Sequence, residues 1–178
     1  MIAIGDSITH GTYHEGDWHV ADPNFATLVK EALGYEELFN YGANGVSVSS
    51  TSDTNGEYAM SLRIGEMEDG ELALVAGGTN DYGTSVELGS PKDRTDVSFY
   101  GALWIFYSEL KKKYEKVYIV TPIRRREDGE NKVGKTLADY REAIEVRAKE
   151  FGFPVIDGYG VPIDPKNEKD AKKYITDG

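Results

Sequence analysis

Cysteine is absent from the 178 residues of this chain. Its absence excludes disulfide bonds, thiolate metal sites and a cysteine nucleophile. It does not identify a compartment, because a chain without cysteine is compatible with reducing and with oxidising surroundings.

Positive charge is scarce. The sequence has 20 Lys and Arg against 31 Asp and Glu, which gives a formal net charge of −11 at pH 7. Like-charge repulsion therefore disfavours nucleic acid and anionic membranes as partners. The basic clusters Lys111–Lys113 and Arg124–Arg126 are short and far apart. We interpret them as solvated charges at a helix end and in a loop.

Long hydrophobic runs are also missing. The longest, such as Leu72–Ala76, fall far short of the ~20 residues that a membrane-spanning helix needs. The N-terminus shows no basic region followed by an apolar one, the pattern of a signal peptide. The sequence therefore predicts a soluble chain. It leaves open whether the chain is cytoplasmic or is secreted after removal of a signal peptide.

The composition and length are typical of one globular domain. Hydrophobic residues make up 39% of the chain and aromatic residues 11%, too many for a disordered protein. A domain of this size buries roughly 70% of the surface that its unfolded chain exposes. We expect a single domain over residues 1–178 with one sizeable core.

Strand-like runs alternate with helix-like stretches along the chain. The runs typical of strands are Ile2–Ile4, Leu38–Tyr41, Leu72–Ala76, Val117–Thr121 and Phe153–Ile156. The stretches with helical periodicity are Asn24–Leu33, Val97–Tyr114 and Thr136–Phe151. This order predicts an α/β fold with right-handed crossovers: a flavodoxin-like, three-layer α/β/α sandwich around a mostly parallel five-stranded sheet.

Three of the predicted strands end in short polar sequences that contain glycine. These are GDS at residues 5–7, NYGANG at 40–45 and GGTND at 77–81. Because the carboxyl ends of parallel strands lie at one edge of a sheet, we expect Ser7, Gly45 and Asn80 to meet in one crevice. A serine hydroxyl attacks an acyl carbon when a base accepts its proton, and fixed N–H donors stabilise the resulting oxyanion. The backbone N–H groups of Ser7 and Gly45 and the side-chain amide of Asn80 are donors of this kind.

These sequences resemble the first three sequence blocks of the SGNH hydrolases, also called the GDSL esterase/lipase family, and they occur in the family's order. The resemblance implies that Ser7 is the nucleophile. It also implies that Ser7, Gly45 and Asn80 supply the donors of the oxyanion hole. A serine esterase of this kind needs no metal and no organic cofactor.

The fourth block of the family is an aspartate followed three residues later by a histidine. The sequence YITDG at residues 174–178 matches its beginning, which makes Asp177 the candidate catalytic aspartate. The sequence stops at Gly178, before the position of the histidine. We therefore expect the catalytic block to be truncated after Asp177–Gly178, and the general base for Ser7 to follow the last residue.

Some residues near these blocks have alternative structural interpretations. Asn80 is also suited to capping a helix or closing a turn through its own backbone. Asp6 and Asp81 adjoin the predicted site, and we assign them to capping the helices that follow the strands.

The three histidines, His10, His14 and His19, lie close together in the sequence. Two histidines four apart are typical of a metal site only on a helix, whereas Gly11 and Gly16 predict a loop, so we predict no metal site. His10 is an alternative base for Ser7, but its short tether disfavours a good approach to the hydroxyl. We place His10 at the mouth of the substrate pocket, with Tyr82 as a second pocket residue.

The sequence as a whole predicts a serine esterase of small acyl esters, foremost acetyl esters, including esters borne by carbohydrate. Polar loops and the lack of an apolar lid favour such substrates over long-chain lipids. The absent histidine supports an alternative, a catalytically impaired carbohydrate-binding or accessory domain of the same fold. A flavodoxin-like cofactor binder is a third interpretation. The expected partner is a small-molecule or carbohydrate ester, and the oligomeric state stays open.

Overall fold

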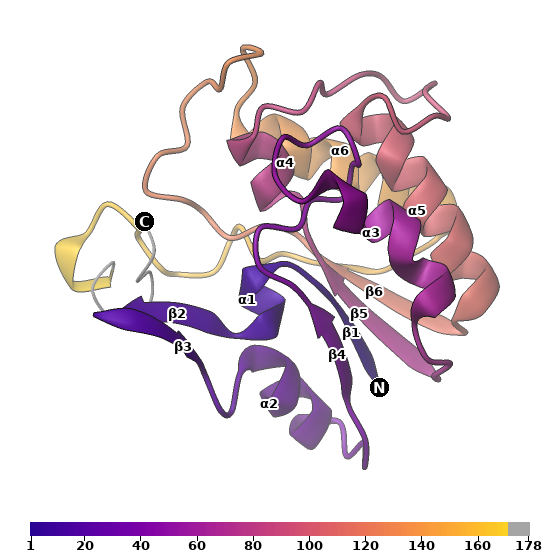
Figure 1. The fold of residues 1–178 in the computed structure, drawn as a ribbon, viewed down its shortest axis with the longest axis vertical. Coiled ribbons are helices and arrows are strands. Elements are labelled where there is room, and N and C mark those ends of the chain that lie inside the picture. The colour runs from indigo at the N-terminus through magenta and orange to yellow at the C-terminus, as the bar shows by residue number, and fades with distance from the viewer. Residues whose placement is uncertain (171–178) are drawn as a thin grey trace.

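The computed structural model describes residues 1–170 (Figure 1). Within these residues a five-stranded sheet forms the centre, with the strand order β4-β1-β5-β6-β7 and every pairing parallel. The strands are β1 Ile2–Gly5, β4 Phe39–Gly42, β5 Leu72–Ala76, β6 Lys116–Val120 and β7 Val155–Ile156. Each of the predicted runs contains or overlaps one of these strands, so their prediction is confirmed.

The three predicted helices form at the predicted places. The helices are α1 Ser7–His10, α2 Phe25–Ala32, α3 Met60–Arg63, α4 Thr79–Gly83, α5 Phe99–Lys113 and α6 Leu137–Phe151. Two 3₁₀ turns, Gly56–Tyr58 and Ile64–Glu66, flank α3. The long helices begin where a side chain accepts the first free N–H groups: Asn24 caps α2, Ser98 caps α5 and Thr136 caps α6.

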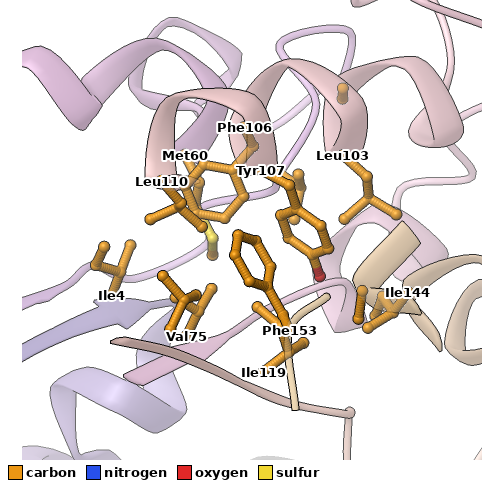
Figure 2. Close-up of a cluster of buried hydrophobic side chains, with 14 of the residues drawn as sticks. Ile4, Met60, Val75, Leu103, Phe106, Tyr107, Leu110, Ile119, Ile144 and Phe153 are labelled. Carbon is orange, nitrogen blue, oxygen red and sulfur yellow. The ribbon is translucent and has the colours of Figure 1, made fainter. Parts of the chain in front are cut away.

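Helices cover the sheet on both faces (Figure 1). The larger core lies between the sheet and α3, α5 and α6, where Phe106, Tyr107 and Leu110 of α5 pack over Val75 and other strand residues (Figure 2). A smaller cluster on the other face joins alternate strand residues to α2: Leu72, Leu74, Phe25 and Val29. Each large apolar side chain buried in this way contributes roughly 1.5–3 kcal/mol. The predicted α/β/α sandwich is therefore observed.

His10 is the last residue of α1, whereas His14 and His19 lie in a β-hairpin rather than the predicted loop. The hairpin comprises β2 Thr12–Glu15 and β3 Asp17–Val20, which pair antiparallel around Gly16. Aromatic pairs across the two strands account for the difference, since such pairs stabilise a hairpin. Tyr13 stacks on His19 with ring centroids 5.3 Å apart, and His14 meets Trp18 edge-on at 5.1 Å.

Within residues 1–170, no group of three or more His, Asp or Glu side chains is arranged to hold a metal ion. None of the helices in this part of the chain is both long enough and apolar enough to cross a membrane.

Candidate active site

Ser7 lies where β1 ends and α1 begins. The neighbours of Gly5 in the sheet are Gly42 of β4 and Ala76 of β5, so three strands end side by side at this point. A side chain at Gly5 would overlap the Thr9 hydroxyl and the Ala76 carbonyl, and only glycine lets the chain turn this tightly into α1. The half-buried Ser7 therefore stands at the carboxyl edge of the sheet.

Asp6 fixes the start of α1. Its carboxylate accepts a 2.9 Å hydrogen bond from the backbone N–H of Ile8, and the side chain is 2% exposed. This is the helix cap predicted for Asp6. The cap holds the short turn that carries Ser7 in place.

The second block forms a loop that passes close to α1. The Asn40 side chain donates to the carbonyl of Thr9 at 2.8 Å, and Ala43 N–H donates to the carbonyl of Gly5 at 3.1 Å. Gly45 follows with φ of +71°, in the left-handed region that favours glycine. A Cβ on Gly45 would lie 3.0 Å from the Asn55 amide nitrogen. Backbone angle and space together account for glycine here.

Asn80 projects from α4, directly after β5. Its Nδ2 donates a 2.9 Å hydrogen bond to the carbonyl of Val46. An amide nitrogen has two N–H groups. This bond therefore turns the nitrogen toward the Gly45 loop, residues 43–50, and leaves the second N–H for a bound oxygen. Asn80 does not cap α4, because the N-cap residue is Gly78 and has no side-chain bond.

The structure therefore brings the three predicted residues to one edge of the sheet. Gly5, Gly42 and Ala76 lie in register at the ends of their strands. Ser7 follows Gly5 by two residues, Gly45 follows Gly42 by three, and Asn80 follows Ala76 by four. Two backbone N–H groups and one side-chain amide at such an edge are the donor set that an oxyanion needs. Their catalytic roles stay predictions. Asp177, the fourth predicted site residue, lies outside the described residues.

Asp81 has a different role from the one predicted. It lies in the first turn of α4 but binds residues that follow the second block: Val48 N–H donates to one carboxylate oxygen and Ser49 N–H to the other, both at 2.9 Å. The side chain is fully buried, and this burial raises the pKa of Asp81 to about 7 against an ordinary value of 3.8. The sequence could not reveal these partners, because they lie more than 30 residues away.

His10 is tied to the loop of Gly45. Its Nδ1 lies 2.8 Å from the Thr12 hydroxyl, which donates to the side-chain oxygen of Asn44 at 2.6 Å. The hydroxyl proton of Thr12 is used for Asn44, so a neutral His10 ring carries its hydrogen on Nδ1 and has Nε2 as the acceptor nitrogen. His10 thus stays beside the predicted site, in a defined tautomer.

Tyr82 was predicted to line the pocket, and the structure places it in the main core instead. Its side chain is 7% exposed, and its hydroxyl donates to the carbonyl of Gly129 at 2.9 Å. Its ring meets Tyr140 of α6 at a centroid distance of 5.9 Å. The turn of α4 directs Tyr82 toward α6, so its role is in packing.

A cavity of about 300 Å³ lies next to the turn of Ser7. The sequence patterns did not predict it. Asp6 and Ile8, the neighbours of Ser7, line one side, and Phe25, Val120 and Ile156 line others. The lining is mostly apolar and comes from α1, α2 and the carboxyl ends of several strands. Such a cavity can take a small apolar group. The sequence signal for this cavity is limited to the apolar residues at the ends of β6 and β7, Val120 and Ile156.

Comparison with known proteins agrees with this geometry. The model of the GDSL-like lipase/acylhydrolase family matches residues 3–178. The chain belongs to this family. This match confirms the resemblance seen in the three sequence blocks. No curated protein matches this GDSL-family chain.

Solved structures share the fold of the GDSL-family chain. A protein from Lactobacillus plantarum superposes with a TM-score of 0.77 at 25% identity, over 96% of this chain and 82% of the other. A possible lipase from Chitinophaga pinensis superposes with a TM-score of 0.68 at 21% identity, over 93% of this chain and 75% of the other. A variant of an acetyl xylan esterase from Geobacillus stearothermophilus superposes with a TM-score of 0.59 at 19% identity, over 88% of this chain and 74% of the other.

Proposed function

We propose that this chain is a serine esterase that hydrolyses small acyl esters, foremost acetyl esters borne by carbohydrate, through an acyl-serine intermediate. The observation that carries the proposal is the meeting of Ser7, Gly45 and Asn80 at one sheet edge, with the Asn80 amide turned toward the Gly45 loop by Val46. Membership of the ester hydrolase family supports it.

The reaction follows from these positions. The Ser7 hydroxyl oxygen attacks the ester carbonyl carbon while a base takes its proton, and the carbonyl oxygen becomes an oxyanion. The N–H groups of Ser7, Gly45 and Asn80 stabilise this negative charge. The C–O bond to the alcohol then breaks, and the alcohol leaves with the proton from the base. Water attacks the acyl-serine in the same way and releases the acid.

The base is assigned by the family resemblance to a histidine three residues after Asp177, with the Asp177 carboxylate orienting it. His10 is the second candidate, because its tautomer leaves Nε2 as an acceptor. The two assignments predict different effects of a His10 substitution on kcat.

Two observations support a small acyl group on a sugar. The mostly apolar cavity of about 300 Å³ next to the turn of Ser7, lined by Asp6 and Ile8, has room for a small acyl group. A structure with the same fold is named an acetyl xylan esterase. Esters with acetyl groups are therefore the first substrates to test, on p-nitrophenol and on xylo-oligosaccharides.

The test uses the protein with its native C-terminus, here called the full-length chain, and compares it with Ser7→Ala and with a control, Ser108→Ala. The Ser108 hydroxyl donates to a carbonyl of its own helix, α5, so its loss leaves the site intact. We expect Ser7→Ala to abolish p-nitrophenyl acetate hydrolysis without unfolding the domain, and Ser108→Ala to retain it. Mass spectrometry of the quenched reaction should find the acetyl group on Ser7. Hydrolysis near the unsubstituted rate in Ser7→Ala would refute the assignment, and sugar binding without hydrolysis would favour the non-catalytic alternative.

A further inference from the structure

Three consecutive backbone N–H groups in the loop after the second block donate to carboxylates. These groups belong to the Gly45 loop. Val48 and Ser49 donate to Asp81, and Ser50 N–H donates to Asp96 at 3.0 Å. These N–H groups have no strand partner, so buried Val48 and Ser49 depend on the carboxylate for their hydrogen bonds.

Asp81 and its neighbour Asn80 hold the Gly45 loop from one turn of α4. Asn80 donates to the carbonyl of Val46, and Asp81 accepts from Val48 and Ser49. Two adjacent side chains thus bind the loop through a carbonyl and two N–H groups on either side of residue 47. The position of the Gly45 N–H relative to the Asn80 amide is consequently fixed by the contact between α4 and this loop.

Holding a loop with a buried carboxylate costs free energy, because the charge is removed from water. Asp81 is fully buried, none of the ion pairs found within residues 1–170 includes it, and Asp6 is the charged group that acts on it. Burial of a charge without a cation costs several kcal/mol unless hydrogen bonds offset it. Two diverging N–H donors need two acceptor oxygens, which a carboxylate offers and an amide does not.

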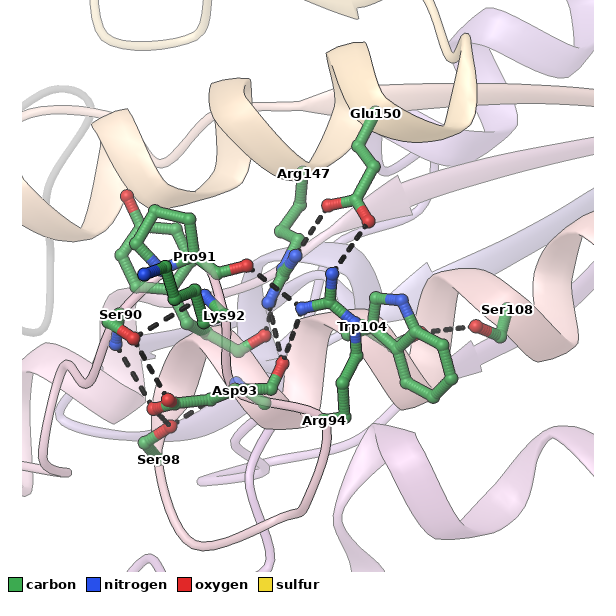
Figure 3. Close-up of polar contacts among 12 residues, drawn as sticks. Ser90, Pro91, Lys92, Asp93, Arg94, Ser98, Trp104, Ser108, Arg147 and Glu150 are labelled. Carbon is green, nitrogen blue, oxygen red and sulfur yellow. Dashed lines mark hydrogen bonds and ion pairs between the residues drawn. The ribbon is translucent and has the colours of Figure 1, made fainter.

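Asp96, which precedes α5, holds the same loop at a second point. Its carboxylate also accepts from the hydroxyl groups of Ser49 at 3.0 Å and Ser61 at 3.2 Å. The segment that carries Asp96 is itself fixed, because the buried Arg147 of α6 donates to the Asp93 carbonyl at 2.8 Å (Figure 3). The Asp93 carboxylate in turn accepts from Ser98 at 2.7 Å. The Gly45 loop is therefore held by α4 and by the segment that precedes α5.

We propose that Asp81 is a positioning residue of the oxyanion hole: its carboxylate holds the Gly45 loop against α4, so that Gly45 N–H and the Asn80 amide face the same oxyanion. This inference rests on the proposed esterase function. Oxyanion donors act only when they are fixed in place before the reaction, and misplacement by about 1 Å can cost about 10²-fold in rate. Asp81 thus acts on the transition state through the loop, without touching substrate.

The test measures kcat, KM and the unfolding midpoint of Asp81→Asn in the full-length chain with p-nitrophenyl acetate, well below the unfolding temperature. Asp139→Asn is the matched control, since Asp139 also accepts a backbone N–H, from Thr136 at 2.7 Å, but at the start of α6. We expect Asp81→Asn to lower kcat by about 10²-fold with KM changed less than about threefold. Asp139→Asn should leave both constants unchanged while lowering the unfolding midpoint.

The outcomes separate this inference from the esterase proposal. If the unsubstituted chain hydrolyses the ester in a Ser7-dependent way but Asp81→Asn behaves like Asp139→Asn, the positioning role is wrong and the esterase proposal stands. If no Ser7-dependent hydrolysis is found, both fall. If Asp81→Asn does not fold, Asp96→Asn replaces it in the same measurement. A lower kcat at constant KM then supports the positioning of the Gly45 loop by these carboxylates, and an unchanged kcat overturns that role.

Discussion

The side-chain amide of Asn80 donates a 2.9 Å hydrogen bond to the carbonyl of Val46, the residue after Gly45. This bond joins the third sequence block to the second, across 34 residues of chain. It also decides which end of the carboxamide faces the site, because a carbonyl accepts only from the nitrogen. The same bond therefore orients one proposed oxyanion donor and anchors the loop of another.

Asn80→Ala removes this donor, and we expect kcat to fall by about 10²–10³-fold while KM changes much less. The loss is selective for kcat because the negative charge develops only in the transition state. Steady-state kinetics with p-nitrophenyl acetate measure both constants. An unchanged kcat together with a lower unfolding midpoint would show that Asn80 has a structural role alone.

His10→Ala tests which residue is the base. For a residue at the mouth of the pocket, we expect KM to rise several-fold and kcat to stay within about tenfold, since the reacting atoms are untouched. Thr12→Val should have a smaller effect in the same direction, because it removes the hydroxyl that bridges His10 and Asn44. A loss of about 10⁴-fold in kcat for His10→Ala would instead identify His10 as the base.

The buried Asp81 predicts a specific dependence of stability on pH. Burial raises its pKa to about 7 in the folded protein, while the unfolded chain releases the proton near the ordinary 3.8. Between these values the folded state binds more protons, so the free energy of unfolding falls as pH rises from about 4 to about 7. Above about pH 7 this contribution is constant.

Denaturant unfolding of the unsubstituted chain and of Asp81→Asn at several pH values isolates this effect, since other groups titrate alike in both. We expect the stability of the unsubstituted chain to decline relative to Asp81→Asn over that range by a few kcal/mol, at about 1.4 kcal/mol per pH unit. A difference that does not vary with pH would contradict the raised pKa.

Arg147 predicts a large stability effect away from the site. Its guanidinium is fully buried and donates to the carbonyl of Tyr100 at 3.0 Å. It also donates to the carbonyl of Asp93 at 2.8 Å (Figure 3). Arg147→Ala leaves both carbonyls without this donor and opens a cavity, so we expect a loss of about 3 kcal/mol or more in the free energy of unfolding. Arg141→Ala, on the same helix but in a partly exposed ion pair with Glu145, should cost less than about 1 kcal/mol. Equal losses would contradict this account.

The sequence alone predicted the five strands of the central sheet and the three long helices, in their order along the chain. Alternating apolar runs and helical periodicity depend on residues a few positions apart, and so do caps such as Thr136, whose side chain accepts from Asp139 N–H. The edge where Ser7, Gly45 and Asn80 meet was predictable for the same reason, because parallel strands place their carboxyl ends together. The family resemblance then assigned a role to each residue.

The side-chain positions and the cavity that depend on contacts between distant segments became apparent only in the tertiary structure. Tyr82 lies in the core because the turn of α4 directs it toward Tyr140, and Asp81 binds the Gly45 loop because α4 packs against that loop. The cavity beside Ser7 is lined by segments from α1 to beyond β7. The free energy of such contacts depends on how the elements pack together, and local sequence patterns carry no information on that packing.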